Sequence, residues 1–237
     1  MTILWTATVG SHMWGQNHAG SDIDLMQCYV APSKDILRGT ADTKSTFAQD
    51  KTKTPPVDLS RHEIGKVVEM LIRPNVNCYW MLFSPYTNDV RALPLSDTPF
   101  SQSTGSSYMD WLRTIVMEHP SKGLWHSTNG LANSNLRKIQ SDELWHDVRW
   151  RNKKLWIVHR TIGFATHLIR DNRVTFQSGP DDGPLDPSSP PTLEQVTAAL
   201  GTLRSVYADS PLPEYPEKAP FLDFLYTVRM WELGGKL

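Results

Sequence analysis

Ser21-Asp22-Ile23-Asp24-Leu25, which begins ten residues after Ser11 of the Gly10-Ser11 pair, is the stretch that decides the fold of this chain. Asp22 and Asp24 project to the same side of the backbone only if the stretch is extended, because successive side chains of a strand alternate between faces. The apolar neighbours of the two carboxylates favour a largely buried strand. Two carboxylates at the end of a buried strand are costly unless a cation neutralises them. Mg²⁺, which prefers hard oxygen ligands, is the natural candidate.

The Gly10-Ser11 pair has the features of a phosphate-binding turn. Residues 3–9 are mostly apolar and predict a short strand, which the pair would connect to a helix through residues 12–14. Glycine lets the backbone approach a ligand closely, and the start of the helix offers N–H groups to phosphate. The order of strand, Gly-Ser turn, helix and Asp-x-Asp strand resembles the DNA polymerase β-like nucleotidyltransferase superfamily.

Asp58 is the best candidate for the third carboxylate that a two-metal phosphoryl transfer site usually needs. It stands between Val57 and Leu59 and so fits a third strand, and the superfamily has an acidic residue with apolar neighbours there. Asp50, in a Lys-rich polar loop, and Glu63, in the helix expected to follow, are weaker candidates. The alternative for Asp58 is a cap of a helix that begins near residue 60.

Further segments narrow the resemblance to the RNA-ligase-associated (RlaP-like) group of predicted nucleotidyltransferases. Pro74-Asn75 stands where that group usually has Asn-Pro. The remaining similar segments cover most of the chain and are residues 10–15, 21–24, 29–32, 58–66, 82–85, 154–160 and 210–213.

The resemblance implies a Mg²⁺- or Mn²⁺-dependent enzyme that transfers a nucleoside monophosphate from an NTP to an acceptor hydroxyl and releases pyrophosphate. Asp22, Asp24 and Asp58 would be the catalytic and metal-binding residues. Gly10 and Ser11 would bind the donor phosphates. Arg160 would reach the triphosphate as a fixed cation; an internal salt bridge is the equal alternative for this residue.

The expected fold class is α/β (α+β), with a small mixed-sheet nucleotidyltransferase core in residues 1–106 and a helical carboxy-terminal part in residues 107–237. Helices are predicted near 61–73, 108–118, 122–140, 141–170, 193–208 and 220–233. Residues 38–56 read as an irregular loop, and residues 86–107 and 177–191 as linkers. The active cleft is expected between the two parts.

Composition describes an ordinary globular protein of 237 residues with 39% hydrophobic and 21% charged residues. No apolar run reaches the roughly 18 to 20 residues that span a bilayer, and no signal peptide is recognisable, so a cytoplasmic protein without membrane contact is expected. Cys28 and Cys78 lie in apolar surroundings and predict buried thiols rather than a disulfide.

Charge is uneven along the chain. Residues 121–176 hold ten Lys and Arg against four acids, 10 − 4 = +6, with interleaved tryptophans at positions 125, 145, 150 and 156. This pattern suits a surface for phosphates and stacked bases, and it equally suits a solvated helix face with core tryptophans. For four other residues, contact with the nucleotide is the less favoured interpretation and a solvated or surface position the better one: His12, His18, His62 and Lys66.

Other classes of function find little support. The chain has no P-loop, no nucleophile elbow and no His/Cys spacing of a zinc site. The rival hypothesis is a catalytically silent nucleotidyltransferase-fold protein, such as an antitoxin-like partner or a nucleotide sensor. The acceptor is open between RNA, a protein and a small molecule. The association of the group with RNA ligases favours RNA, and nothing indicates the reading of a DNA sequence.

Overall fold

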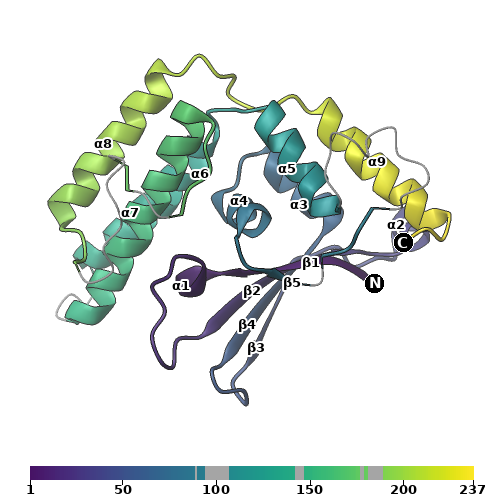
Figure 1. Cartoon of the computed structure of the whole chain (residues 1–237), viewed down its shortest axis with the longest axis horizontal. Coiled ribbons are helices and arrows are strands. Elements are labelled where there is room, and N and C mark those ends of the chain that lie inside the picture. The colour runs from purple at the N-terminus through teal and green to yellow at the C-terminus, as the bar shows by residue number, and fades with distance from the viewer. Residues whose placement is uncertain (89, 94–106, 142–146, 177–178, 181–188) are drawn as a thin grey trace. The chain divides into compact units, whose positions relative to one another are not determined.

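A computed structural model describes residues 1–88, 90–93, 107–141, 147–176, 179–180 and 189–237 of the chain (Figure 1). The chain divides into two compact units. Unit 1 comprises residues 1–72, 77–119 and 216–237, and unit 2 comprises residues 73–76 and 120–215. The first and last segments of the chain therefore belong to the same unit.

Unit 1 is built around a sheet in which five described strands have the order β3-β4-β2-β1-β5. The strands are β1 (Thr2–Val9), β2 (Ile23–Val30), β3 (Thr46–Asp50), β4 (Val57–Glu63) and β5 (Thr87–Asn88). β2 and β4 are parallel, and the other neighbouring pairs are antiparallel. The mixed sheet and the many helices after it confirm the predicted α/β fold with a helical carboxy-terminal part.

Three local predictions in the sheet are wrong, and the first is the linker expected at residues 86–107, which contains the short strand β5 paired with β1. The loop expected at residues 38–56 contains the edge strand β3, whose polar and exposed sequence hides its pairing with β4. The helix expected from residue 61 begins only at Ile64, because β4 pairs with β2 on one side and continues to Glu63. Asp58 is therefore a strand residue, and the alternative that it caps a helix is excluded.

The helices of unit 1 cover one face of the sheet near β1 and β2 (Figure 1). They are α1 (Gly10–Met13), α2 (Ser33–Leu37), α3 (Ile64–Ile72), α4 (Val76–Phe83), α5 (Tyr108–Glu118) and α9 (Ala219–Leu233). Trp5 on β1, Cys28 on β2 and Cys78 on α4 are completely buried below or within this layer. Both cysteines are free, as predicted, and burial raises the pKa of each thiol.

A buried ion pair joins α9 to the sheet. The Glu63 side chain is 1% exposed, and its Oε1 lies 2.6 Å from Nη2 of Arg229. The amide of Gly65 donates to the other carboxylate oxygen at 2.7 Å, so both oxygens of Glu63 have partners. Aromatic packing of Trp111 on Phe224, with ring centroids 4.9 Å apart, adds α5 to the same cluster.

Unit 2 contains α6 (Leu124–Ser141), α7 (Val148–Asp171) and α8 (Leu193–Asp209), and α7 packs against both other helices. Residues 161–169 of α7 are all buried, which makes this helix the centre of the unit. The predicted helices near 108–118, 193–208 and 220–233 correspond to α5, α8 and α9. Among the described residues, no helix combines the length and apolar character needed to span a membrane.

Candidate active site

Asp24 and Asp58 lie side by side on β2 and β4, as neighbours in the parallel register. Neighbouring strands are about 4.8 Å apart, and paired residues point to the same face of a sheet. On its other side Asp24 pairs with Val9, the last residue of β1. Asp58 pairs with Gln49 on the edge strand β3. We call Val9, Asp24, Asp58 and Gln49 the acidic row.

Gly10 follows the first residue of the acidic row and lies against Asp24. Its φ of +64° is in the left-handed region that favours glycine. A Cβ added at this position would lie 2.7 Å from Cγ of Asp24 and closer still to Oδ2. The backbone of the predicted phosphate-binding turn therefore touches the carboxylate predicted to bind metal, with no room for a side chain between them.

The turn with Ser11 is anchored in the core of unit 1. Ser11 is half-buried in α1, and its carbonyl accepts a hydrogen bond of 2.9 Å from the amide of Gln16. Trp14 follows α1 and packs edge-on against Trp80 of α4, with ring centroids 5.9 Å apart. This packing fixes Gly10 and Ser11 relative to the sheet.

Asp22 is exposed and comes one residue before β2. The amide of Ile23 donates to the carbonyl of Pro56 at 2.8 Å, which ties this entry of β2 to the entry of β4. Asp24 lies within β2, whereas Asp22 precedes the strand, so the register places only Asp24 in the acidic row and the position of Asp22 beside it stays a prediction.

Gln49 is a site residue that sequence analysis missed. Its Nε2 donates to Oδ1 of Asp58 at 2.8 Å. The residue lies in the segment expected to be a loop, and only the pairing of β3 with β4 brings it beside Asp58. An amide donor next to a carboxylate holds the side-chain orientation and partly compensates its charge.

The residues of the acidic row suit Mg²⁺ in their chemistry, because carboxylate oxygens are its preferred protein ligands. The side chains do not form a finished metal site: among the described residues, no three His, Cys, Asp or Glu side chains are gathered as ligands of one ion. Asp58 is engaged with Gln49 instead.

The weaker candidates for the third carboxylate have structural partners. Asp50 accepts hydrogen bonds from Thr52, including one of 2.6 Å from Oγ1, and these lower the pKa of Asp50. Glu63 lies at the opposite end of β4 from Asp58 and holds Arg229.

Side-chain contacts also occupy two residues considered for contact with nucleotide. Nδ1 of His62 is 2.8 Å from Oγ of Ser45, and burial lowers the pKa of this histidine. Lys66 donates to Glu69 at 2.9 Å.

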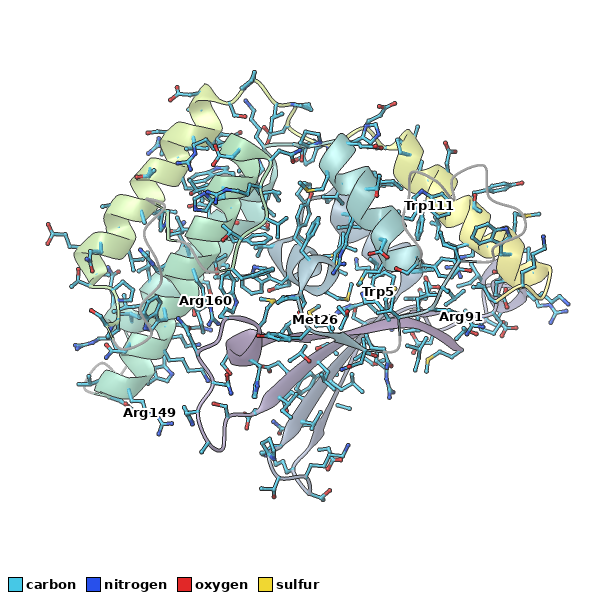
Figure 2. All side chains as sticks on the ribbon, viewed as in Figure 1. Trp5, Met26, Arg91, Trp111, Arg149 and Arg160 are labelled. Carbon is cyan, nitrogen blue, oxygen red and sulfur yellow. The ribbon has the colours of Figure 1, made fainter. Side chains whose placement is uncertain are left out.

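Arg160 lies on α7 in unit 2, whereas the three aspartates lie in unit 1. Figure 2 labels Arg160 and the more exposed Arg149 on the same helix. Arg160 is 6% exposed and is therefore almost completely buried. Its contact with a nucleotide stays a prediction.

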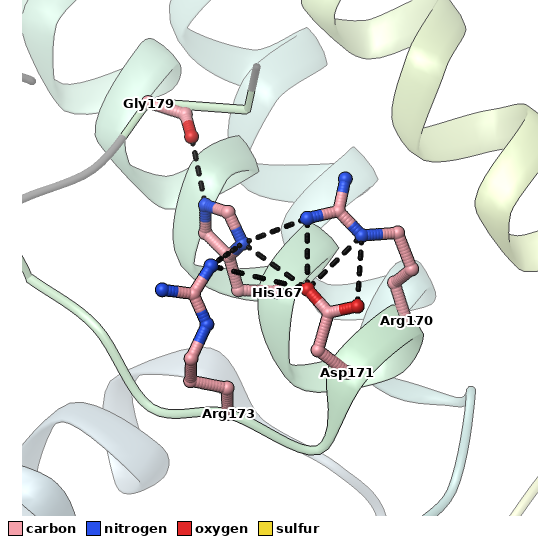
Figure 3. Close-up of polar contacts among 5 residues, drawn as sticks. All are labelled: His167, Arg170, Asp171, Arg173 and Gly179. Carbon is pink, nitrogen blue, oxygen red and sulfur yellow. Dashed lines mark hydrogen bonds and ion pairs between the residues drawn. The ribbon is translucent and has the colours of Figure 1, made fainter. Parts of the chain in front are cut away.

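Part of the basic stretch is structural. His167 is completely buried, and its Nε2 donates to the carbonyl of Gly179 at 2.8 Å, since a carbonyl can only accept (Figure 3). Nδ1 then accepts from Nη2 of Arg170 at 3.2 Å and of Arg173 at 2.9 Å. Asp171 holds Arg170 with hydrogen bonds of 2.8 to 3.0 Å.

The tryptophans of the stretch pack within unit 2. Trp125 stacks on Tyr207 with ring centroids 5.5 Å apart, and Nζ of Lys154 lies 5.7 Å from the ring centre of Trp150. Trp145 lies outside the described residues. The hypothesis that this stretch binds phosphates and bases remains a prediction. It now concerns fewer basic residues than the charge count indicated, because Arg170 and Arg173 have partners within unit 2.

Comparison with known proteins adds one finding. The family model RlaP, described as the RNA repair pathway DNA polymerase beta family, matches residues 1–174. The matched region includes the whole acidic row, the Gly-Ser turn and α7. No curated protein matches the chain.

Proposed function

This chain belongs to the RlaP family, the RNA repair pathway DNA polymerase beta family, and from that membership we propose that it is a magnesium-dependent nucleotidyltransferase with an RNA end as acceptor. The observation that carries the proposal is the contact of the Gly10 backbone with Asp24, which is itself in register with Asp58. A phosphate-binding turn and two carboxylates then serve one ligand, which is what transfer from a nucleotide requires.

In the proposed reaction the acceptor hydroxyl oxygen attacks the α-phosphorus of an NTP. The bond from that oxygen to phosphorus forms as the bond between the α-phosphorus and the bridging oxygen to the β-phosphate breaks. Pyrophosphate leaves with the bonding electrons, and the hydroxyl proton passes to Asp58 or to solvent. Attacking and leaving oxygens are roughly in line in such displacements.

Each site residue has a role in this proposal. Gly10 and Ser11 bind the β- and γ-phosphates with the backbone and hydroxyl of the turn at the start of α1. Asp22, Asp24 and Asp58 would hold Mg²⁺ or Mn²⁺, which when bound neutralises the triphosphate and stabilises the developing charge. Asp58 would exchange its hydrogen bond with Gln49 for this task and orient the acceptor hydroxyl.

The choice of RNA as the acceptor is supported by the family's description, which refers to an RNA repair pathway. Arg160 is proposed to contact the triphosphate, so Arg160→Lys should raise the KM for NTP while kcat changes little.

The experiment that tests the function is release of pyrophosphate from each NTP with Mg²⁺ or Mn²⁺ and RNA with free terminal hydroxyls. Asp24→Asn and Asp58→Ala should each lower turnover about 100-fold or more, as expected when positioning of charge is lost. Asp58→Ala should leave NTP affinity nearly unchanged, because the donor phosphates are bound elsewhere.

The control is Asp35→Asn on α2, an acidic residue outside the acidic row, which should keep full activity. Full activity of an Asp22→Asn/Asp24→Asn double variant would refute the proposed roles. NTP binding by the parent protein without any pyrophosphate release would indicate the silent binding protein instead.

A further inference from the structure

The edge strand β3 carries an exposed aromatic residue on the face of the acidic row. Phe47 is 65% exposed, although phenylalanine is among the residue types most often buried. It pairs with Ser60 on β4, and Ser60 pairs with Met26 on β2. Figure 2 labels Met26 on the sheet. Phe47, Ser60 and Met26 form a second row, which we call the apolar row.

The apolar row lies on the same face as the acidic row. Phe47 is two residues from Gln49, and Ser60 is two residues from Asp58, so strand alternation places all four side chains on one face. The hydrogen bond from Gln49 to Asp58 shows that paired side chains meet on this face. Rows two residues apart are separated by about 6.7 Å, less than the length of a nucleoside.

The order of residues in the acidic row gives the direction from which an acceptor enters. Gly10 and Ser11, proposed to bind the leaving pyrophosphate, follow Val9 at one end of the row, and Gln49 is at the other end. Because attacking and leaving oxygens are in line, the acceptor approaches from the side of Gln49 and β3. An acceptor that enters there passes Phe47.

We propose that Phe47 stacks on the terminal nucleobase of an RNA acceptor and that Gln49 and Ser60 line the same acceptor subsite. This inference rests on the proposed function and assigns an acceptor position that the function alone does not give. An exposed aromatic ring binds any nucleobase through its π-face, so the subsite is tolerant of sequence. The polar side chains beside it suit the ribose hydroxyls.

The test uses a short single-stranded RNA with 2-aminopurine at its 3′ end, whose fluorescence falls when the base stacks. The full chain should quench this fluorescence in the absence of NTP. Phe47→Ala should weaken RNA binding about 10-fold to 100-fold, which corresponds to loss of one stacked base, and should abolish the quenching. Phe47→Trp should keep both affinity and quenching.

Two variants separate stacking from other roles. Phe47→Leu keeps an apolar side chain without a π-face, and we expect it to behave like Phe47→Ala. Leu37→Ala removes an apolar residue that is 78% exposed on α2, outside both rows, and should leave binding unchanged. Parent-like quenching by Phe47→Leu, or equal losses in the Phe47 and Leu37 variants, would overturn the proposal.

The outcome is distinguishable from failure of the proposed function. Asp58→Ala should lose nucleotide transfer and still quench the RNA probe in a Phe47-dependent way. A parent protein that transfers nucleotide to RNA without dependence of the acceptor KM on Phe47 would refute the subsite alone. Light scattering tests whether β3 instead pairs with a second copy of this chain. A parent dimer that dissociates in Phe47→Ala, with unchanged RNA affinity, would support that pairing and overturn the proposal.

Discussion

At the scale of single residues, the candidate site depends on a position that lacks a side chain. Gly10 combines a left-handed backbone with close approach to Asp24, and each of these excludes other residues for a separate reason. Gly15 has the same φ of +64° but nothing within 4 Å of an added Cβ. A comparison of substitutions at Gly10 and Gly15 therefore separates the effect of backbone strain from the effect of the contact with Asp24.

Gly10→Ala should destabilise the protein by more than Gly15→Ala. Both variants incur about 1 kcal/mol or more for alanine in the left-handed region, and only Gly10→Ala also displaces the Asp24 carboxylate. Urea unfolding measures the difference, and pyrophosphate release should be lost in Gly10→Ala and kept in Gly15→Ala. Equal behaviour of the two variants would mean that Asp24 yields to a methyl group without consequence.

The sequence predicted the positions of Asp22, Asp24 and Asp58 on or next to strands, because apolar neighbours and alternation are local signals. Gln49 and Phe47 were not predictable. Their strand is short and exposed on both faces, so no hydrophobic pattern marks it. Only its pairing with β4 brings Gln49 beside Asp58 and Phe47 beside Ser60.

At the scale of elements, the end of α7 shows how a buried histidine organises charged neighbours. Asn172 adopts a left-handed conformation with φ of 47° and ends the helix. His167 and Asp171 then hold the two arginines of this end. Sequence analysis included Arg170 and Arg173 in a basic surface, because spacing along the chain does not show which charges are paired.

Asp171→Asn should lower stability at neutral pH and have less effect in acid. Hydrogen bonds from Arg170 hold the pKa of Asp171 below its usual range. A carboxylate with a lowered pKa in the folded state stabilises fully above its unfolded pKa of about 3.9 and loses this contribution as the pH falls through the lowered value. Urea unfolding of variant and parent between pH 7 and pH 3 should therefore converge toward acid.

The exposed Asp209 at the end of α8 is the control for this experiment. Asp209→Asn should show a small difference at every pH. A pH-independent cost of Asp171→Asn would mean that the carboxylate acts through its shape and not through its charge.

At the scale of the whole molecule, chain order and unit membership differ. Sequence analysis placed a boundary near residue 106. In the structure, contacts between residues group α5 and α9 with the sheet in unit 1. A change of composition marks a linker but does not tell which later helix returns to an earlier unit. The contact that brings α9 back joins Arg229 to Glu63, residues 166 positions apart.

Arg229→Met should destabilise unit 1 by about 3 kcal/mol, because it leaves the buried carboxylate of Glu63 without its charged partner. Adding Glu63→Gln should recover part of the loss, since the uncompensated charge is then removed. Arg204→Met, at an exposed position of α8, is the control and should be nearly neutral. Urea unfolding measures all three, and a loss no larger than that of the control would contradict a stabilising role for the ion pair.

Because α9 belongs to unit 1, the order of synthesis on the ribosome determines when unit 1 can finish folding. Residues 120–215 of unit 2 are made as one run and can pack as they emerge, whereas unit 1 needs residues 216–237. Until then the nascent chain leaves Glu63 without Arg229 and Trp111 without Phe224. Unit 1, which contains the acidic row, can therefore finish folding only after α9 has been translated. A prematurely terminated product would lack a folded unit 1 and would be exposed to proteolysis.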